Sequence, residues 1–559
     1  MTPWLSTLTL GLLLAVTGLF RQPDPRPARP VSVQELTARL PVCGVGHVGG
    51  IPASVLQQPV ALRSGLGAVP TPTSTKSAEA QAFYDQGMAY LHGYVWVEAA
   101  RSFHEALRRD SILALAHVQL SWIYSQLDDT TAARREARRA KALEKWASER
   151  EKAHIRLRFS HLRALDSLTN ETLLSAYRRD LSQAIRKFPN DVELWLLLGN
   201  AHERYADGRG QGSGPAVIAV YEKVLRLAPD HPAAHHYLIH ANEGMMNYEA
   251  ALVHGEVYAR LAPNLPHALH MYAHDLMKTG RVDEAIEYLT RADGIERQTF
   301  ETERYKPDFD WHHAHNLTLL ALCYQYQGRL TEAEAALKRV YTMTRPGDPQ
   351  LAFYTKKSYP ELLLLTGRTA EAEALARELT GAKTPGERLL GHYLLGMVHA
   401  EQQRWAEARR EADAALAELP AIRKANPSGY ILGRVEPYPR FLKALLALHE
   451  PNPSEKTLAA VREFQKAARE QTGPDPWVEA LFQLETLARH AQAAGLTAFA
   501  EESVKTLTEH DGGYAGTHYA LAQLARQRGD APTARRELAL ATAGWQRGDA
   551  AFRKRMGLN

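Results

Sequence analysis

Two consecutive segments of equal length decide the fold of this chain: residues 232–265, PAAHHYLIHANEGMMNYEAALVHGEVYARLAPNL, and residues 266–299, PHALHMYAHDLMKTGRVDEAIEYLTRADGIERQT. Both carry histidine at their fifth and ninth positions and alanine at their twentieth. Apolar residues recur at helical spacing through both, so each segment predicts helices. The sequence therefore repeats with a fixed period that equals the length of one segment. Such self-similarity indicates a repeat architecture.

The period continues on both sides of these segments. The unit that starts at Ala80 has Gly87 at position 8 and Ala99 at position 20. Alanine also occupies position 20 of later units, as Ala333, Ala372, Ala408, Ala500 and Ala534. Small residues at positions 8 and 20 let two antiparallel helices approach closely, since neither helix can bury its apolar face alone. Residues 148–191 and 421–480 are helical but off-period, and we interpret them as degenerate repeats in an array of eleven or twelve helix pairs.

This pattern resembles the tetratricopeptide repeat. Gly280, Gly328 and Gly367 follow its first helices, where a residue that tolerates positive φ is favoured. The resemblance implies an all-α fold, a right-handed α-solenoid of antiparallel helix pairs whose first helices line a concave surface. It also implies a binding protein that holds a peptide or protein partner in its concave groove.

A second resemblance covers Leu66 to Leu120 and the histidine segments that follow. Its opening motif, Gln81-Ala82-Phe83-Tyr84-Asp85-Gln86-Gly87, looks like the first repeat of a largely uncharacterised group of bacterial tetratricopeptide proteins with histidine-rich central repeats. The group's later segments correspond to residues 231–243, 267–274 and 315–318, with Thr318 in place of the last histidine. The resemblance implies a shared histidine-lined site and brings no established reaction.

Histidines are concentrated in these repeats, because eleven of the 24 lie between positions 231 and 315. His236 and His270 both occupy repeat position 5, and His240 and His274 both occupy position 9. Residues four apart share a face of a helix, and neighbouring helices pack about 8–10 Å apart. We therefore expect a two-by-two array of imidazoles on the concave wall.

Imidazole is the commonest side-chain ligand for transition metals, and three or four histidines with a carboxylate suit a metal that keeps an open position. The predicted metal ligands are His236, His240, Glu243, His267, His270 and His274. The predicted accessory residues are His315, Tyr237 and Asp275. The expected cofactor is a transition metal, Zn, Cu or Fe. Two alternatives stay open: a metal-free groove that binds an acidic or polar ligand, and histidines that only pack or are solvated.

The remaining residues of interest have simpler interpretations. His235 is expected to pack within its helix pair, and His254 is expected to be exposed on a second helix. His312 and His313 fall in an insertion between two repeats and are expected in a loop or lid. The stretch Arg134–Lys152, rich in Arg and Lys, alternates with glutamates, which is typical of a solvated helix face and, alternatively, of a patch for an anionic partner.

Composition and motifs exclude several classes of function. Sixty-seven Lys and Arg against 63 Asp and Glu leave a net charge of +4, so we expect no nucleic-acid partner recruited by bulk charge. Two cysteines, Cys43 and Cys323, exclude a disulfide scaffold, and Cys323 is expected in the core. His-Glu-x-x-His, a phosphate-binding loop and a Gly-x-Ser-x-Gly elbow are all missing from the sequence. No catalytic residue is therefore assigned, and a metalloenzyme that uses the histidine pairs remains the alternative function.

The N-terminal region differs from the repeats. The stretch from Trp4 to Phe20 is an uncharged apolar run, which predicts a signal peptide or membrane anchor at residues 1–20. We therefore expect an exported protein, periplasmic or extracellular, or a membrane-anchored one that contacts the membrane only through this segment. Nine prolines between positions 23 and 72 predict an extended linker over residues 21–78. The expected array then comprises residues 79–420 with the histidine-rich groove, degenerate helical repeats at 421–480, and C-terminal repeats and a cap at 481–559.

Overall fold

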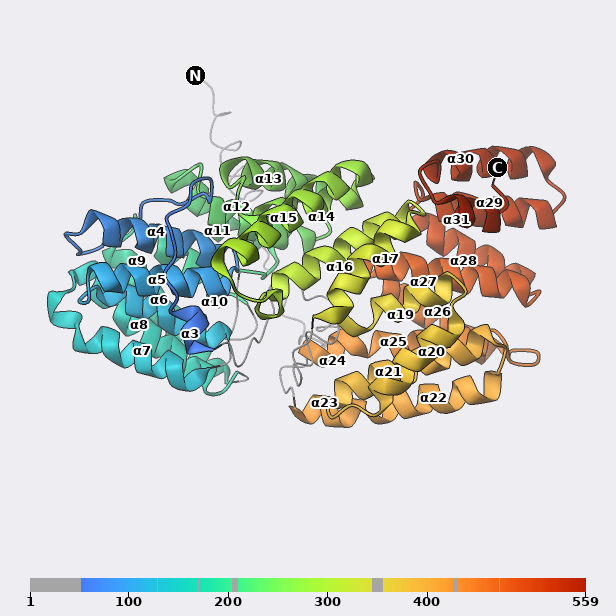
Figure 1. Cartoon of the computed structure of the whole chain (residues 1–559), viewed down its shortest axis with the longest axis horizontal. Helices are drawn as coiled ribbons and strands as arrows, with labels where there is room; N and C mark the ends of the chain where they lie inside the picture. Colours follow the sequence, from blue (N-terminus) through green and yellow to red (C-terminus); the bar gives the residue numbers. More distant parts are fainter. Residues whose placement is uncertain are drawn as a thin grey trace, which may run out of the picture. The chain divides into compact units, whose positions relative to one another are not determined.

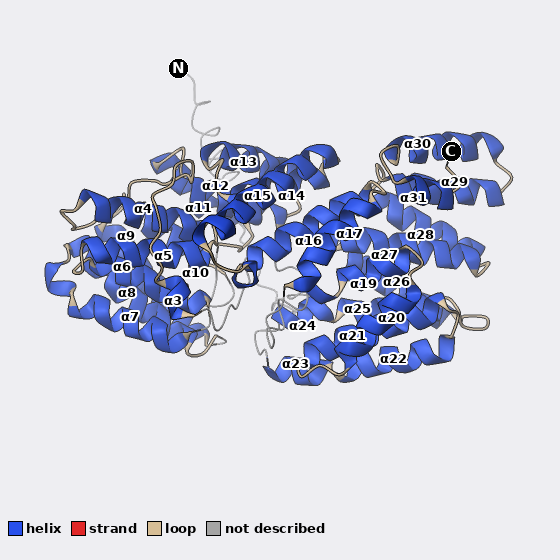
Figure 2. Cartoon of the chain, viewed as in Figure 1, coloured by secondary structure: helices blue, strands red, loops and turns tan. Residues whose placement is uncertain are grey.

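A computed structural model of the chain describes residues 52–127, 129–168, 170–203, 210–343, 355–425, 430–471 and 473–558. Every regular element in these ranges is a helix, which confirms the all-α prediction (Figure 2). The apolar run from Trp4 to Phe20 and Cys43 lie outside the described residues. Within the ranges given above, none of the helices combines the length and apolar composition that a membrane span requires.

Antiparallel pairs of helices follow one another along the chain (Figure 1). The helices up to the histidine-rich repeats are α3 (Ala53–Leu56), α4 (Ala78–His92), α5 (Trp96–Arg109), α6 (Ala114–Gln126), α7 (Thr130–Ala142), α8 (Glu149–Leu165), α9 (Glu171–Lys187), α10 (Val192–Ala201), α11 (Pro215–Leu227), α12 (Pro232–Glu243), α13 (Tyr248–Leu261), α14 (Pro266–Lys278) and α15 (Val282–Glu303).

The second part of the array continues in the same manner. Its helices are α16 (Trp311–Tyr326), α17 (Leu330–Thr342), α19 (Ser358–Leu365), α20 (Thr369–Thr380), α21 (Pro385–Glu401), α22 (Trp405–Ala417), α23 (Leu419–Ala425), α24 (Tyr430–Val435), α25 (Pro437–Ala447), α26 (Glu455–Arg469), α27 (Pro474–Ala493), α28 (Thr497–His510), α29 (Ala515–Gln527), α30 (Ala531–Gly544) and α31 (Ala550–Arg555). The off-period stretches are helical, as expected from their sequence.

The residues that define the repeat act as predicted. A Cβ added to Gly87 would lie 2.6 Å from the Phe103 ring, and one added to Gly199 would lie 2.1 Å from the Tyr221 ring. These small residues therefore let the two helices of a pair approach to ring contact. Gly280 and Gly328 end first helices with φ of 78° and 71°, a conformation that glycine adopts without steric cost.

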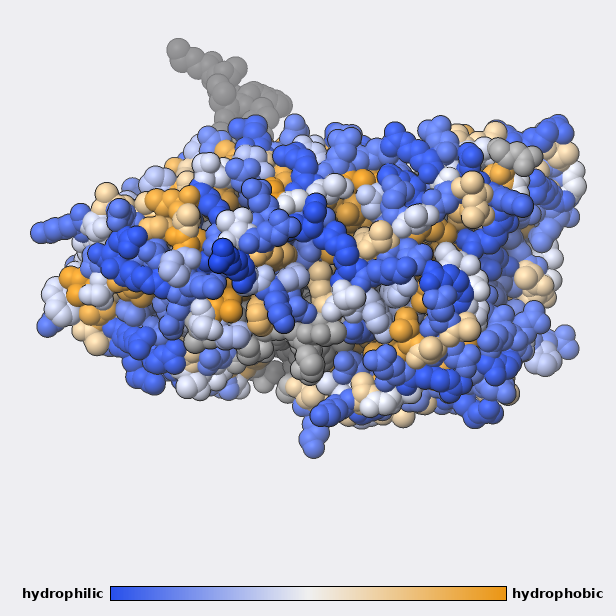
Figure 3. All heavy atoms as spheres, in the orientation of Figure 1, coloured by the Kyte–Doolittle hydropathy of each residue, from blue (hydrophilic) through white to orange (hydrophobic). Residues whose placement is uncertain are grey.

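The histidine-rich repeats lie where the two largest apolar cores meet. One core joins α4–α7 to α12 and α13, and the other runs from α14 to α31. Helix α14 contributes to both, with Ala268 and Met271 in the first core and Leu269 and Tyr272 in the second. Figure 1 shows α12, α14 and α16 between α4–α9, coloured blue to cyan, and the orange α25–α28. The surface in the same view is mostly hydrophilic, with small scattered apolar patches (Figure 3).

Residues 52–77, which we call the N-terminal strap, pack against the repeats. They therefore differ from the extended linker that the proline content predicts. Apart from the short α3, the residues of the strap form turns, bends and irregular backbone, and Leu56, Val60 and Leu66 are buried in the first core. The backbone N–H of Asn264 donates to Gly65 O at 2.8 Å, and the buried Arg101 guanidinium donates to Pro59 O at 2.5 Å. Its few apolar side chains and carbonyl groups thus fix the strap to the repeats.

Candidate metal centre

Three first helices carry the histidines of the candidate site. His236, His240 and Glu243 project from α12, and His267, His270 and His274 project from α14. His312 and His315 project from α16. Proline at the first position starts both α12 and α14, so the same residues of the two helices face the same side.

These side chains are buried, and the expectation of histidines exposed on an open groove is wrong. The side chains of His236, His240, His267, His270 and His274 have no exposed surface. Three elements cover them: the α4–α5 turn, helix α16 and the start of α27. A partner in the groove therefore cannot contact the imidazoles directly.

The histidines form two groups and not a single two-by-two array. The first triad is His236, His240 and His267, and the second triad is His270, His274 and His315. Each triad offers three ligand nitrogens that lie within 4.8 Å of one another. The predicted metal ligands are thus divided between two triads, with His267 of α14 in the first and His270 and His274 in the second, and His315, predicted as an accessory residue, belongs to the second triad.

The nitrogen atoms of the first triad lie at coordination spacing. His236 Nε2 is 3.1 Å from His240 Nε2 and 2.9 Å from His267 Nε2. In the second triad, His270 Nε2 is 2.7 Å from His274 Nε2. Ligands about 2.0–2.1 Å from one tetrahedral ion are separated by about 3.3 Å, so small side-chain rotations suffice to bind an ion in either triad.

The hydrogen-bond partners of Nδ1 fix the tautomers of His236 and His270. His236 Nδ1 lies 2.7 Å from the backbone oxygen of His92, which can only accept a hydrogen bond. His270 Nδ1 lies 3.0 Å from Asn316 Oδ1, and the Asn316 amide nitrogen donates to Leu289 O, so Oδ1 is the acceptor. Both rings therefore carry their proton on Nδ1 and direct the lone pair of Nε2 into the triad.

Carboxylates lie beside the Nδ1 atoms of three further rings. Glu243 Oε2 lies 3.4 Å from His240 Nδ1, and Glu243 Oε1 lies 3.3 Å from His274 Nδ1. Asp475 Oδ2, from the start of α27, lies 3.0 Å from His315 Nδ1. Carboxylates and carbonyls behind metal-bound imidazoles orient the rings and increase their basicity. Glu243 contacts one histidine of each triad and so links the two triads.

The protonation states suit metal binding. Burial lowers the pKa of His236, His267 and His270 well below 6.5, and lowers that of His274 to about 4 despite the opposing effect of Glu243. Burial raises the pKa of Glu243, but hydrogen bonds with His240 and His274 outweigh it and the pKa is lowered. Neutral imidazoles and an ionised carboxylate are the forms that bind and support a cation.

Tyr94 covers the first triad in a strained conformation. Its ring centroid lies 4.6 Å from that of His236 and 5.0 Å from that of His267, and its φ is 57°. Gly280 occupies the same place in the α14–α15 turn, where a left-handed residue is needed. A left-handed non-glycine residue costs about 1–2 kcal/mol, so the contact with the triad is retained at the expense of stability.

Two predicted accessory residues lie away from the ligand nitrogens. The Tyr237 hydroxyl lies 2.8 Å from His92 Nδ1 and so holds the residue whose carbonyl accepts the hydrogen bond from His236 Nδ1. Asp275 is fully buried, neither of its oxygens has a hydrogen-bond partner among the described residues, and burial followed by repulsion from Glu243 raises its pKa.

The sequence analysis missed or misplaced several residues of the site. His312 and His313 lie on α16 and are buried, and are not in a loop or lid as expected. The spacing of His312 and His315, three positions apart, would have placed them on one helix face had the helix been recognised from Trp311 onward. Nothing local in the sequence indicates Asp475. His235 packs as expected, whereas its partner His254 is half-buried and not exposed.

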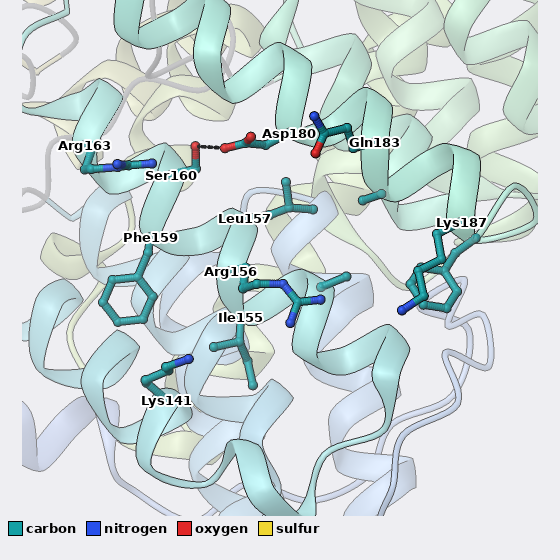
Figure 4. A pocket seen from close by; sticks show the side chains of 13 residues that line it. Lys141, Ile155, Arg156, Leu157, Phe159, Ser160, Arg163, Asp180, Gln183 and Lys187 are labelled. Atoms are coloured by element: carbon teal, nitrogen blue, oxygen red, sulfur yellow. Dashed lines mark hydrogen bonds between the residues drawn. The ribbon is translucent and has the colours of Figure 1, made fainter.

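A separate basic pocket opens between α7, α8 and α9. Its volume is 580 Å³, and its cationic lining residues are Lys141, Arg156, Arg163 and Lys187. Figure 4 shows these cations around Phe159 and Ile155, with Ser160 hydrogen-bonded to Asp180 on one wall. Lys141 also belongs to the basic stretch that the sequence singled out.

Sequence comparison identifies the repeat. The profile of the tetratricopeptide repeat matches residues 266–299 and 314–345, which include all of α14 and α17 and most of α15 and α16. No curated protein sequence matches the chain. These matches and the helix pairs define a tetratricopeptide-type helical repeat protein, and such solenoids present extended surfaces for binding proteins.

Solved structures of similar architecture have low sequence identity. The crystal structure of yeast Tom70 is similar at 13% identity with a TM-score of 0.33, over 86% of this chain and 99% of that one. The human IFIT1 dimer with PPP-AAAA is similar at 12% identity with a TM-score of 0.35, over 84% of this chain and 91% of that one. Scores this low transfer no ligand or site from either protein.

Proposed function

We propose that this tetratricopeptide-type protein binds transition-metal ions in its two buried histidine triads. The observation that carries the proposal is the convergence of Nε2 atoms at 2.7–3.1 Å, where His236 and His270 present lone pairs because their Nδ1 atoms face acceptors. An N–H···N hydrogen bond joins such nitrogens only in pairs, whereas one cation can bind all three nitrogens of a triad. Three neutral imidazoles suit Zn, Cu or Fe and leave a coordination position open.

Metal content tests this proposal directly. Elemental mass spectrometry of purified protein, incubated with Zn, Cu or Fe and desalted, is expected to find bound metal that the variant His240→Gln/His274→Gln has lost. His518→Gln is the matched control, since His518 contacts Glu537 on α30 far from the triads in sequence. Circular dichroism verifies that the variants remain helical. Equal metal content in wild type and double variant would contradict the proposal.

A metalloenzyme is the second form of this proposal. The open position expected at a three-histidine ion is the feature that catalytic metals share. When bound there, such an ion would act as a Lewis acid or, as Cu or Fe, as a redox centre. Metal-dependent ester hydrolysis or oxygen consumption that disappears in His315→Gln would support the enzyme. Full metal loading without either activity would favour a structural or storage role.

We also propose a partner site, at the basic pocket and not at the buried histidines. Four cations line an open 580 Å³ pocket, and their excess of positive charge is complementary to an acidic peptide segment. Lys141 and Arg156 also contact Glu144, and Lys187 contacts Glu149, so such a peptide would compete with these carboxylates. Fluorescence anisotropy with a labelled oligoglutamate peptide is expected to show at least tenfold weaker binding for Arg156→Glu/Arg163→Glu. Lys456→Glu/Lys505→Glu, which reverses two exposed charges elsewhere, is the control. Similar losses of affinity in both variants would mean that peptide binding depends only on net charge and not on this pocket.

The proposed location is periplasmic or extracellular, by export, or at a membrane, by anchoring. The support is the uncharged apolar run at residues 4–20 of the sequence. Fractionation and N-terminal sequencing of the protein from its host separate a cleaved signal peptide from a retained anchor. An intact N-terminus in the soluble cytoplasmic fraction would contradict both.

A further inference from the structure

We propose that the two triads form one dinuclear centre, and that His312 is its seventh nitrogen ligand. The proposal rests on the metal-binding function proposed above and specifies how the two ions are arranged. Its consequence is an unequal pair: one ion with four histidine ligands and one with three.

His312 lies between the triads. Its ring centroid is 4.9 Å from that of His267, in the first triad, and 4.9 Å from that of His270, in the second. The interplanar angles are 73° and 72°, so its ring meets both at nearly the same inclination. The rings of His267 and His270 are themselves stacked with centroids 6.0 Å apart. The two triads are therefore adjacent, and His312 fills the space at their junction.

His312 leaves one ring nitrogen free for a ligand. His312 Nδ1 lies 2.5 Å from Glu296 Oε1, a carboxylate that accepts a hydrogen bond from it. The other ring nitrogen, Nε2, has no hydrogen-bond partner among the described residues although the side chain is only 1% exposed. Buried polar atoms are normally paired, so an unpaired nitrogen beside two triads indicates a missing ligand partner.

His313 provides an internal contrast. It contacts the other oxygen of the same carboxylate, with Nδ1 2.7 Å from Glu296 Oε2. Its Nε2, however, lies 3.5 Å from Arg339 Nη2, and its ring contacts Phe300. Two neighbouring histidines thus share one carboxylate, and only His312 faces the triads.

The surrounding charge suits two cations. Glu243, Glu296 and Asp475 are buried carboxylates, and each contacts the Nδ1 atom of at least one histidine of the group. Glu243 contacts both triads and so opposes the repulsion between two bound ions. Arg434 Nη2 lies 4.0 Å from Asp475 and offsets part of this negative charge. A single lone pair on His312 binds one ion at a time, which makes the pair unequal.

Copper loading tests the arrangement. Wild-type protein titrated with Cu(II) is expected to bind two equivalents, measured by elemental mass spectrometry. Its electron paramagnetic resonance spectrum is expected to show magnetic interaction between the two ions, as broadening and a half-field signal. His312→Phe keeps an aromatic ring but removes the nitrogen. This variant is expected to bind one of the two ions at least tenfold more weakly and to lose the four-nitrogen hyperfine pattern.

The controls separate this inference from the metal-binding function. His313→Phe is expected to leave both equivalents and the spectrum unchanged, and His312→Gln replaces His312→Phe if the latter misfolds. Two bound but magnetically isolated ions, with identical titrations in wild type and the His312 variants, would overturn the dinuclear centre while leaving metal binding intact. Absence of any bound metal in wild type would overturn both.

Discussion

Asn316 decides which nitrogen of His270 is available to a metal. Its amide nitrogen donates to Leu289 O at 3.0 Å, which leaves its oxygen as the acceptor for His270 Nδ1, also at 3.0 Å. The same logic applies to the backbone oxygen of His92 and the ring of His236. The acceptors that contact Nδ1 therefore orient these two rings and determine which nitrogen faces the triad.

Replacing Asn316 by leucine is expected to weaken metal binding. The substitution removes the acceptor that fixes the His270 tautomer, and loss of such outer partners typically costs about 10–100-fold in metal affinity. Competition against a chromophoric Zn chelator measures the change. Asn242→Leu is the control, because the Asn242 amide donates to Leu238 O on α12 without contacting a triad ring. An affinity unaffected by Asn316→Leu would show that the tautomer is fixed by other contacts.

Glycines within two helices of this array differ in what surrounds them. Gly199 in α10 lies against Tyr221 of the paired helix, whereas a Cβ on Gly294 in α15 would meet no atom within 4 Å. Both glycines lie within helices and neither has a positive φ. The same substitution therefore probes packing at one position and intrinsic helix propensity at the other.

Alanine at these two positions is expected to change stability in opposite directions. Gly199→Ala forces the Tyr221 ring away and lowers the free energy of unfolding by about 1–3 kcal/mol. Gly294→Ala has free space and raises it by about 0.5–1 kcal/mol through helix propensity. Urea denaturation followed by circular dichroism measures both. Equal effects would mean that α10 and α11 do not pack as closely as described.

At the end of α28, a buried histidine makes stability depend on pH. His510 Nε2 donates to Trp477 O at 2.9 Å, and burial lowers its pKa to about 4 although that hydrogen bond opposes the shift. Because the folded-state pKa lies below the ordinary 6.5, the unfolded chain takes up the proton first. The stabilisation is complete above pH 6.5 and is lost as the pH falls toward 4.

His510→Gln keeps a donor for Trp477 O and removes the titration. Between pH 7 and pH 5, wild type is expected to lose about 2 kcal/mol more unfolding free energy than this variant. Denaturation series at half-unit pH steps give the comparison. Parallel pH profiles for the two proteins would show that the imidazole titrates normally.

At the scale of the whole described array, distant repeats contact one another. Trp545 Nε1 donates to Tyr326 O at 3.1 Å, and the backbone N–H of Asp549 donates to Gly328 O at 3.0 Å. The α16–α17 turn is therefore packed against the last helices of the array, although many repeats separate the two along the chain. In a simple solenoid each repeat would contact only its neighbours, so these contacts join parts that would otherwise unfold independently.

Asp549 caps α17 from this distance. Its Oδ2 accepts from the backbone N–H of Thr331 at 2.8 Å, and the residue before α17, Arg329, provides no side-chain cap. Asp549→Ala is expected to lower the free energy of unfolding by about 0.5–2 kcal/mol, the usual value for a helix cap. Asp549→Asn, which retains an acceptor, is expected to remain close to wild type. Hydrogen exchange at the start of α17 locates the effect, and protection unchanged in Asp549→Ala would contradict the cap.

The repeat, the helices and the register of the central histidines can be predicted from local patterns in the sequence. A constant period and small residues at positions 8 and 20 depend only on local spacing, and so does the shared face of His236 and His240 or of His270 and His274. The candidate ligands from α12 and α14 follow from that register.

The grouping of those histidines, the elements that cover them, and the positions of His315 and His312 beside them follow from the tertiary structure. His315 on α16 contacts Asp475 on the distant α27, and the strap crosses from Pro59 at Arg101 to Gly65 at Asn264. A helical period fixes the direction of each side chain about its own helix. The meeting of distant helices depends on small rotations between successive repeats, which accumulate along the array and leave no local trace in the sequence.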